Sequence, residues 1–240
     1  MLDTRGLYPV AIGCTGGSGS RVLWDILETS PQIFMDRDYH ENTKDSRKSK
    51  KILKFVDAPS ETICRWLEKF MMTILDQIPA GEETRYQYFG WKTPRTVEYV
   101  DALFQVHPEL RFLHLIRDPA AVARGGQQNK FYTRKKAKGK IDPNAERDEF
   151  ILARWAKQNL PVWKKHKDNP RYLLVRYEEI INRPEQTIQR IFDWLGVTEY
   201  KMSEALAVIT SPADAISRGD NVDVSMIAEA VQQLGYGHRL

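Results

Sequence analysis

A glycine- and serine-rich stretch is the first candidate for chemistry in this sequence. Residues 11–27 read AIGCTGGSGSRVLWDIL, so that a small-residue loop separates an apolar run from an amphipathic segment. Backbone N–H groups in such a loop, at the N-terminus of a helix, bind anions because the helix dipole favours negative charge there. The stretch therefore predicts that the N–H groups of Gly17 to Arg21 face an anion.

The loop matches neither of two common nucleotide-binding signatures. The triphosphate loop needs G-x-x-x-x-G-K-[ST], whereas the span from Gly13 to Gly19 is one residue too long and Ser20 has no lysine before it. The chain thus lacks the lysine with which a P-loop-type nucleotide kinase would reach the outer phosphates. The dinucleotide fingerprint G-x-G-x-x-G would need a small residue at Val22, although Asp36 could stand for its ribose-binding acid.

The elements that must position this loop follow from the alternation of apolar and amphipathic segments. Short apolar runs predict strands at residues 8–13, 88–91, 111–116 and 171–175. Amphipathic patterns predict helices at 63–78, 97–106, 147–165 and 184–195. Residues 130–140 are expected to form a basic loop. Strands separated by helices pair in parallel, so we expect an α/β fold, a single domain over residues 1–240 with a central parallel sheet flanked by helices.

Basic residues follow three of the expected strands: Lys92, Arg117 and Arg176. Ligands of open α/β sheets bind at the carboxyl ends of the strands, so we expect these cations to converge on the loop. Asp118 could be mistaken for a magnesium ligand, but a salt bridge or a turn role before Pro119 is the favoured interpretation. No metal is expected.

Composition excludes several classes of function. The 36 Lys and Arg residues exceed the 32 Asp and Glu residues by only four, which is too mild a basic balance for nucleic-acid binding but suits an anionic small ligand. The two cysteines, Cys14 and Cys64, cannot build a disulfide framework. Neither a signal peptide nor an apolar run of roughly 20 residues is present. A cytoplasmic enzyme without a membrane span is therefore expected.

Four stretches together resemble the sulfotransferases that use 3′-phosphoadenosine 5′-phosphosulfate (PAPS). They are the loop at 12–23, GWKTPR at 90–95, RFLHLIRDPAAVARG at 111–125 and the RYE…P…LGV block at 176–197. The resemblance implies a P-loop-like sulfotransferase fold. It also implies transfer of a sulfuryl group from PAPS, as co-substrate, to a hydroxyl or amine of a small-molecule or carbohydrate acceptor.

The resemblance further implies roles for single residues. Those that would bind the 5′-phosphosulfate are Gly16, Gly17, Ser18, Gly19, Ser20 and Arg21. Arg117 would hold the 3′-phosphate, and Tyr177 would lie near the adenine. Gly17 and Gly125 depart from the family pattern, because a basic residue and a serine are common there. Arg21 could replace the missing charge, and the Ser217-Arg218-Gly219 stretch the missing contact.

Proton removal from the acceptor requires a general base. By analogy with phosphoryl transfer, Lys92 and Arg21 are the candidates for stabilising the departing phosphate. Glu41 is the first choice of base and His40 the second, with Asp45 nearby, because the family uses a carboxylate or a histidine. His114, inside an expected strand, is assigned a structural role.

Two questions stay open on the sequence alone. A scaffold that binds the nucleotide without turnover is an alternative to the enzyme. The basic segments 44–54 and 130–140 are either solvated loops, which we favour, or flank a site for an anionic acceptor.

Overall fold

The computed structural model describes residues 4–36, 60–142, 144–210 and 219–240. Five strands form one sheet in the order β2-β3-β1-β4-β5, and every neighbouring pair is parallel. The strands are β1 (Tyr8–Cys14), β2 (Ile33–Met35), β3 (Tyr88–Lys92), β4 (Arg111–Ile116) and β5 (Tyr172–Arg176). The expected α/β class with a central parallel sheet is thereby confirmed.

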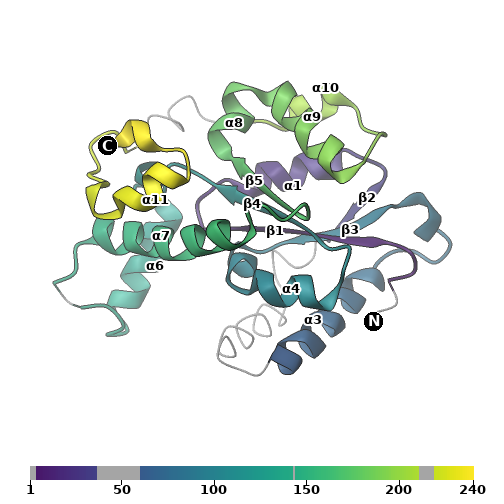
Figure 1. Ribbon diagram of the computed structural model, residues 1–240, viewed down its shortest axis with the longest axis horizontal. Coiled ribbons are helices and arrows are strands. Elements are labelled where there is room, and N and C mark those ends of the chain that lie inside the picture. The colour runs from purple at the N-terminus through teal and green to yellow at the C-terminus, as the bar shows by residue number, and fades with distance from the viewer. Residues whose placement is uncertain (1–3, 37–59, 143, 211–218) are drawn as a thin grey trace.

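Helices cover both faces of this sheet (Figure 1). One face carries α1 (Ser20–Glu28), α8 (Tyr177–Asn182), α9 (Pro184–Leu195) and α10 (Met202–Ala207). The opposite face carries α3 (Ser60–Leu75) and α4 (Val100–Val106), which follows the 3₁₀ turn η2 (Pro94–Tyr99). A third group gathers around α7 (Arg147–His166): α5 (Pro119–Ala123), α6 (Gly126–Lys136) and α11 (Ala228–Gln233), with the short 3₁₀ turns Ser225–Ile227 and Gly237–Arg239. A separate 3₁₀ turn, Glu83–Arg85, precedes β3.

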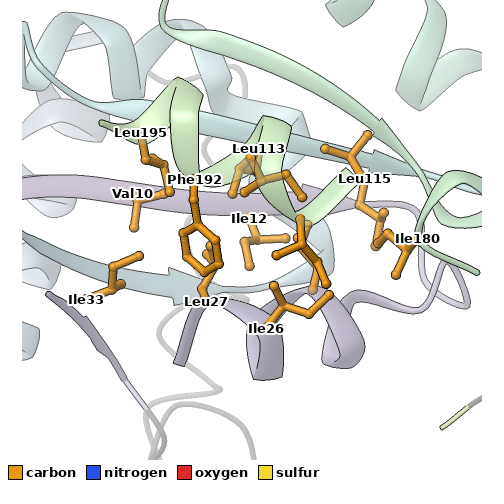
Figure 2. Packing of buried hydrophobic residues seen from close by; sticks show 14 of the residues in the cluster. Val10, Ile12, Ile26, Leu27, Ile33, Leu113, Leu115, Ile180, Phe192 and Leu195 are labelled. Atoms are coloured by element: carbon orange, nitrogen blue, oxygen red, sulfur yellow. The ribbon is translucent and has the colours of Figure 1, made fainter. Parts of the chain in front are cut away.

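The apolar side chains of the central strands account for this layering. A parallel sheet covered on both faces needs strands that are apolar on both sides. Val10 and Ile12 of β1 belong to the cluster with α1 and α9, whereas Ala11, between them, belongs to the cluster with α3 and α4. Figure 2 shows Ile12 and Leu113 packed beside Phe192 of α9. The two faces of one strand thus pack against two different layers of helices.

Two segments differ from the expectation. Residues 130–140 are not simply a loop, because α6 continues to Lys136. Lysine, arginine and glutamine favour a helix, but this one has no apolar stripe to reveal it. The edge strand β2 has only three residues, Ile33 to Met35, too few to show an alternating pattern. By contrast, Gly196 ends α9 in the left-handed conformation, as expected for a C-cap.

Candidate functional site

The glycine-rich loop connects the central strand β1 to α1 at the carboxyl end of the sheet. Gly17 and Gly19 have φ values of +94° and +82°, in the left-handed region that glycine tolerates best. A Cβ on Gly19 would also lie 2.4 Å from the ring of Tyr177. α1 begins at Ser20, and the N–H groups at the start of a helix point out of it, here toward the loop. Two N–H groups of the segment have backbone partners: that of Ser18 donates to Thr15 at 3.2 Å and that of Val22 to Gly19 at 3.1 Å. The loop therefore has the backbone form of an anion site.

Ser18 gives a second observation that suits an anion. Its side chain is fully buried, and within the described part of the chain its Oγ makes no hydrogen bond. A buried hydroxyl without a partner costs about 1–3 kcal/mol. An oxygen of a phosphate or sulfate bound in the loop would satisfy it, so the residues present fit an anionic group.

Arg117, directly after β4, lies against this loop. Its Nη1 donates to the carbonyl oxygen of Gly17 at 3.3 Å, and the residue is only 9% exposed. Its guanidinium carbon lies 4.4 Å from the ring centroid of Tyr177, a cation–π contact that orients the planar group. The indole of Trp155 donates to the carbonyl oxygen of Arg117 at 3.0 Å. The structure thus brings Arg117 and Tyr177 together beside the loop.

Lys92, the last residue of β3, pairs in register with Ile12 of the central strand. Burial lowers the pKa of its amine, and the nearby charge of Arg21 lowers that pKa further, against the opposing effects of Cys14 and Asp25. An anion bound between Lys92 and Arg21 would relieve this repulsion. The pair is suited to stabilising negative charge that develops in a reaction.

Buried hydrogen bonds hold the first residue of the loop, Thr15. The hydroxyl of Tyr172 contacts Nδ1 of His114 at 2.6 Å, and Nε2 of His114 contacts Oδ1 of Asn159 at 2.9 Å. Asn159 in turn donates to Oγ1 of Thr15 at 3.0 Å, and Thr15 donates to Gln158 at 3.2 Å. Burial lowers the pKa of His114 to about 4. Its ring is therefore neutral near pH 7 and acts structurally, as expected from the sequence.

Two residues beside the loop were missed in the sequence. The buried amide of Gln128, on α6, donates to the carbonyl oxygen of Gly16, and Arg154, on α7, donates to Oε1 of Gln128 at 3.1 Å. Arg154 also lowers the pKa of the Cys14 thiol, although burial has the larger effect and raises it to about 11. A guanidinium thus stands near the loop that lacks a basic residue at Gly17. The sequence placed Arg154 on an expected helix, but it gave no sign that this helix contacts Gln128 beside the loop.

Of the other expected site residues, the structure describes Gly125 and Gly219, and both are packed closely against backbone atoms of neighbouring residues. Gly125 is the N-cap of α6, where a Cβ would meet the carbonyl oxygen of Val122 at 3.1 Å. Gly219 packs against α5, because a Cβ there would lie 2.4 Å from the backbone of Ala120. The remaining expected residues fall outside the described part of the chain: His40, Glu41, Asp45, Ser217 and Arg218, together with the side chain of Arg95 and the basic segment 44–54.

Arg176 does not join the other cations at the loop. Its Nε donates to the carbonyl oxygen of Leu234 at 2.9 Å, and its Nη1 pairs with Glu179 at 2.9 Å. Asp118 likewise has structural partners: Oδ1 accepts from the N–H groups of Ala120 and Ala121 at the start of α5, and Oδ2 pairs with Arg239. This agrees with a turn and salt-bridge role for Asp118.

The described ranges contain no sign of a metal centre or of a membrane-spanning helix. Among those residues, no group of three or more His, Cys, Asp or Glu side chains is placed to hold a metal ion. Within the same ranges, no helix combines the length and apolar character needed to cross a membrane.

Several solved structures share this fold. The sulfotransferase domain from the curacin biosynthetic pathway is 16% identical, with a TM-score of 0.62 over 96% of this chain and 98% of that chain. The sulfotransferase from Alicyclobacillus acidocaldarius is 15% identical, with a TM-score of 0.56 over 96% of each chain. Sulfotransferase STF9 from Mycobacterium avium is 12% identical, with a TM-score of 0.55 over 95% of this chain and 76% of that chain.

The sequence comparisons are more specific than the fold. No curated protein sequence matches the chain at a significant level. The family model described as "Sulfotransferase family" matches residues 9–201, a range that includes the loop, Lys92, Arg117 and Tyr177. With the family model covering most of its length, the chain belongs to the sulfotransferase family.

Proposed function

We propose that this protein transfers a sulfuryl group from PAPS to a hydroxyl or amine of a small-molecule or carbohydrate acceptor. The observation that carries the proposal is the meeting of the glycine loop with Arg117 and Tyr177 at the carboxyl end of the sheet. Loop N–H groups and a strand-end arginine provide separate places for two anionic groups of one nucleotide. Membership in the sulfotransferase family supports the reaction class.

The nucleotide would span these two places. The N–H groups of Gly17, Gly19, Ser20 and Arg21 and the hydroxyl of Ser18 would bind the 5′-phosphosulfate, whereas the N–H of Ser18 donates to Thr15. Gln128 holds Gly16 in place. Arg117 would bind the 3′-phosphate, because its fork of N–H donors suits a dianion. In this arrangement Tyr177 supports the guanidinium from one side and would lie near the adenine. Arg218, Gly219 and Gly125 are proposed to complete the 3′-phosphate side.

The reaction needs charge stabilisation and proton removal. PAPS supplies an activated sulfuryl group, and its transfer leaves negative charge on the phosphate oxygen to which that group was bonded. Lys92 and Arg21 would stabilise this charge, since both cations stand at the loop. We assign the general base to Glu41, with His40 as second choice: it would remove the acceptor proton as the acceptor oxygen or nitrogen bonds to sulfur.

A thermal-shift comparison tests the nucleotide. The product nucleotide, 3′-phosphoadenosine 5′-phosphate (PAP), should stabilise the protein, by about 2.7 kcal/mol when present at 100 times its dissociation constant. ATP with magnesium should give a smaller shift. A larger shift with ATP and magnesium would instead favour a P-loop-type kinase.

A turnover assay separates an enzyme from a binding scaffold. Incubation with PAPS and a panel of hydroxyl and amine acceptors should release PAP in proportion to the sulfated product. Nucleotide binding without release for any acceptor would identify the scaffold. Glu41→Gln should lower turnover about 10²-fold or more while the affinity for PAP stays nearly unchanged. Unchanged turnover would transfer the role of base to His40 or Asp45.

A further inference from the structure

The turn that carries Arg117 is held by residues far away in the sequence. Asp118 is buried, with 3% of its surface exposed, and its Oδ2 accepts a hydrogen bond from Nε of Arg239 at 2.5 Å. The other oxygen, Oδ1, caps α5 through the N–H groups of Ala120 and Ala121. One carboxylate therefore connects the start of α5 to the segment that contains Arg239.

The same guanidinium reaches a second segment. Nη1 of Arg239 pairs with Oδ1 of Asp220 at 2.8 Å. Asp220 follows Gly219, whose Cα packs against the backbone of Ala120. Arg239 thus joins two turns, one beside Arg117 and the other directly after Gly219.

Tyr236 reinforces this connection. Its hydroxyl donates to Oε2 of Glu178 at 2.8 Å, and Oε1 of Glu178 accepts from the N–H of Asp118 at 3.0 Å. The ring of Tyr236 also packs edge-on against Trp155, at a centroid distance of 6.0 Å, and Trp155 donates to the carbonyl oxygen of Arg117. The carbonyl oxygen of Arg117 and the N–H of Asp118 therefore both have side-chain partners from other elements.

We propose that Arg239 is a positioning residue for the 3′-phosphate site, since it sets the separation of the Asp118 and Asp220 turns. The inference rests on the proposed function, in which Arg117 binds the 3′-phosphate. Two carboxylates already occupy the guanidinium, so Arg239 acts through geometry rather than by contacting the nucleotide. Its planar fork reaches both carboxylates at once, which a lysine ammonium would do less well.

The test compares a nucleotide that carries a 3′-phosphate with one that does not. Dissociation constants are measured for PAP and for adenosine 5′-phosphosulfate, which has no 3′-phosphate. Arg239→Ala should weaken PAP about 10-fold or more, by analogy with residues that orient metal ligands, and change the other nucleotide less than about twofold. Arg239→Lys should recover part of the loss. Asp220→Asn removes an exposed partner and should give a smaller loss of the same kind.

A matched control comes from the opposite end of the sheet. Arg171 donates to the backbone carbonyls of Phe104, His107 and Pro108. Arg171→Ala should lower the melting temperature but leave the ratio of the two affinities unchanged. Amide exchange adds a readout without nucleotide, since Arg239→Ala should speed the exchange of residues 117–123.

The outcomes separate the two proposals. A wild-type protein that shows no preference for PAP would refute the proposed placement of the 3′-phosphate, and the inference with it. A wild-type preference that Arg239→Ala and Asp220→Asn leave intact would overturn the inference alone. Equal losses for both nucleotides, or unchanged exchange of residues 117–123, would also overturn it.

Discussion

The neighbouring strands β4 and β5 both end near an arginine, but the two side chains have different roles. Arg117 faces the glycine loop and stacks on Tyr177, whereas Arg176 binds Glu179 and the carbonyl of Leu234. The register explains the difference. Ile116 of β4 pairs with Arg176 of β5, so Arg117 lies one residue further along the sheet than Arg176. Successive strand residues point to opposite faces, and one residue is therefore enough to separate the two side chains.

The clusters of apolar residues agree with this alternation. Leu115, Val175 and Tyr177 belong to the cluster with α1, which is the face next to the loop. Ile116, which pairs with Arg176, belongs to the cluster around α7. A basic residue at a strand end can thus bind an anion in the loop only when its side chain points to the face of the sheet on which the loop lies.

Lys92 extends the comparison to a third strand and should show the largest effect. Lys92 lies four residues after Tyr88 on the same strand, so both side chains point to the face covered by α1. Lys92→Met should lower turnover about 10²- to 10³-fold, the cost of losing one donor to a developing negative charge. PAP affinity should fall much less. Steady-state kinetics with PAPS test this, and equal losses in turnover and affinity would assign Lys92 to ground-state binding alone.

The pKa of Lys92 adds a pH dependence. Burial lowers this pKa below the ordinary value of 10.5, and the protonated amine is the form that stabilises anionic charge. Turnover should therefore decline as pH rises through the lowered pKa, earlier than for an ordinary lysine. Lys92→Arg should move this decline to higher pH, because a guanidinium keeps its proton. If turnover of Lys92→Arg declined at the same pH as in the wild type, the decline would reflect the titration of a group other than Lys92.

The next effect contrasts the two arginines directly. Arg117→Ala should weaken PAP by about 2–3 kcal/mol, as expected for a lost charged donor, and hardly affect adenosine 5′-phosphosulfate. Arg176→Ala should lower stability but leave the preference for the 3′-phosphate unchanged. Calorimetric titration of both variants checks the contrast. Similar losses of PAP affinity in the two variants would remove the distinction drawn from the register.

A pair of glycines gives a smaller effect. Gly19 and Gly196 are both left-handed, with φ of +82° and +73°, but a Cβ meets the Tyr177 ring only at Gly19, whereas the space at Gly196 is open. Gly196→Ala should cost about 1–2 kcal/mol of stability, the usual penalty of a side chain in that conformation. Gly19→Ala should cost more and weaken PAP as well. Urea unfolding and PAP titration compare them, and equal costs would mean that Tyr177 moves aside freely.

The last effect concerns acid stability at β4. His114 has a pKa of about 4 in the fold and about 6.5 when unfolded, so the unfolded chain binds more protons between these values. Stability should be complete above pH 6.5 and fall as pH drops toward 4, with a slope of at most about 1.4 kcal/mol per pH unit for this group. His107 and His166 have lowered pKa values and add to the slope. In urea unfolding, the free energy of unfolding of His114→Gln should depend less steeply on pH than that of the wild type.

The sequence predicted the strands whose apolar runs are long enough to read. The runs at 8–13, 88–91, 111–116 and 171–175 lie within one residue of β1, β3, β4 and β5 at each end. The start of α5 at Pro119 and the end of α9 at Gly196 also agree with the local preferences of these two residue types. Each of these signals depends only on residues that are neighbours in the sequence, so a single sequence is enough to detect it.

The site was predictable only in part, because contacts between distant segments have no local signal. Arg117 and Tyr177 were expected near the loop, but the neighbours Gln128 and Arg154 were not. The different role of Arg176 depends on register, which cannot be read before the strands are paired. The base candidates Glu41 and His40 lie outside the described residues and stay predictions.

The central place of β1 in the sheet has a consequence for synthesis of the chain. Its two partners are β3 and β4, and β4 ends at Ile116, roughly 100 residues after β1. At translation rates of about 5–20 residues per second, the apolar strand YPVAIGC waits roughly 5–20 s for its second neighbour. During that time the edge of β1 that pairs with β4 is open to other chains. A growing chain should therefore gain protease resistance only after β4 has left the ribosome.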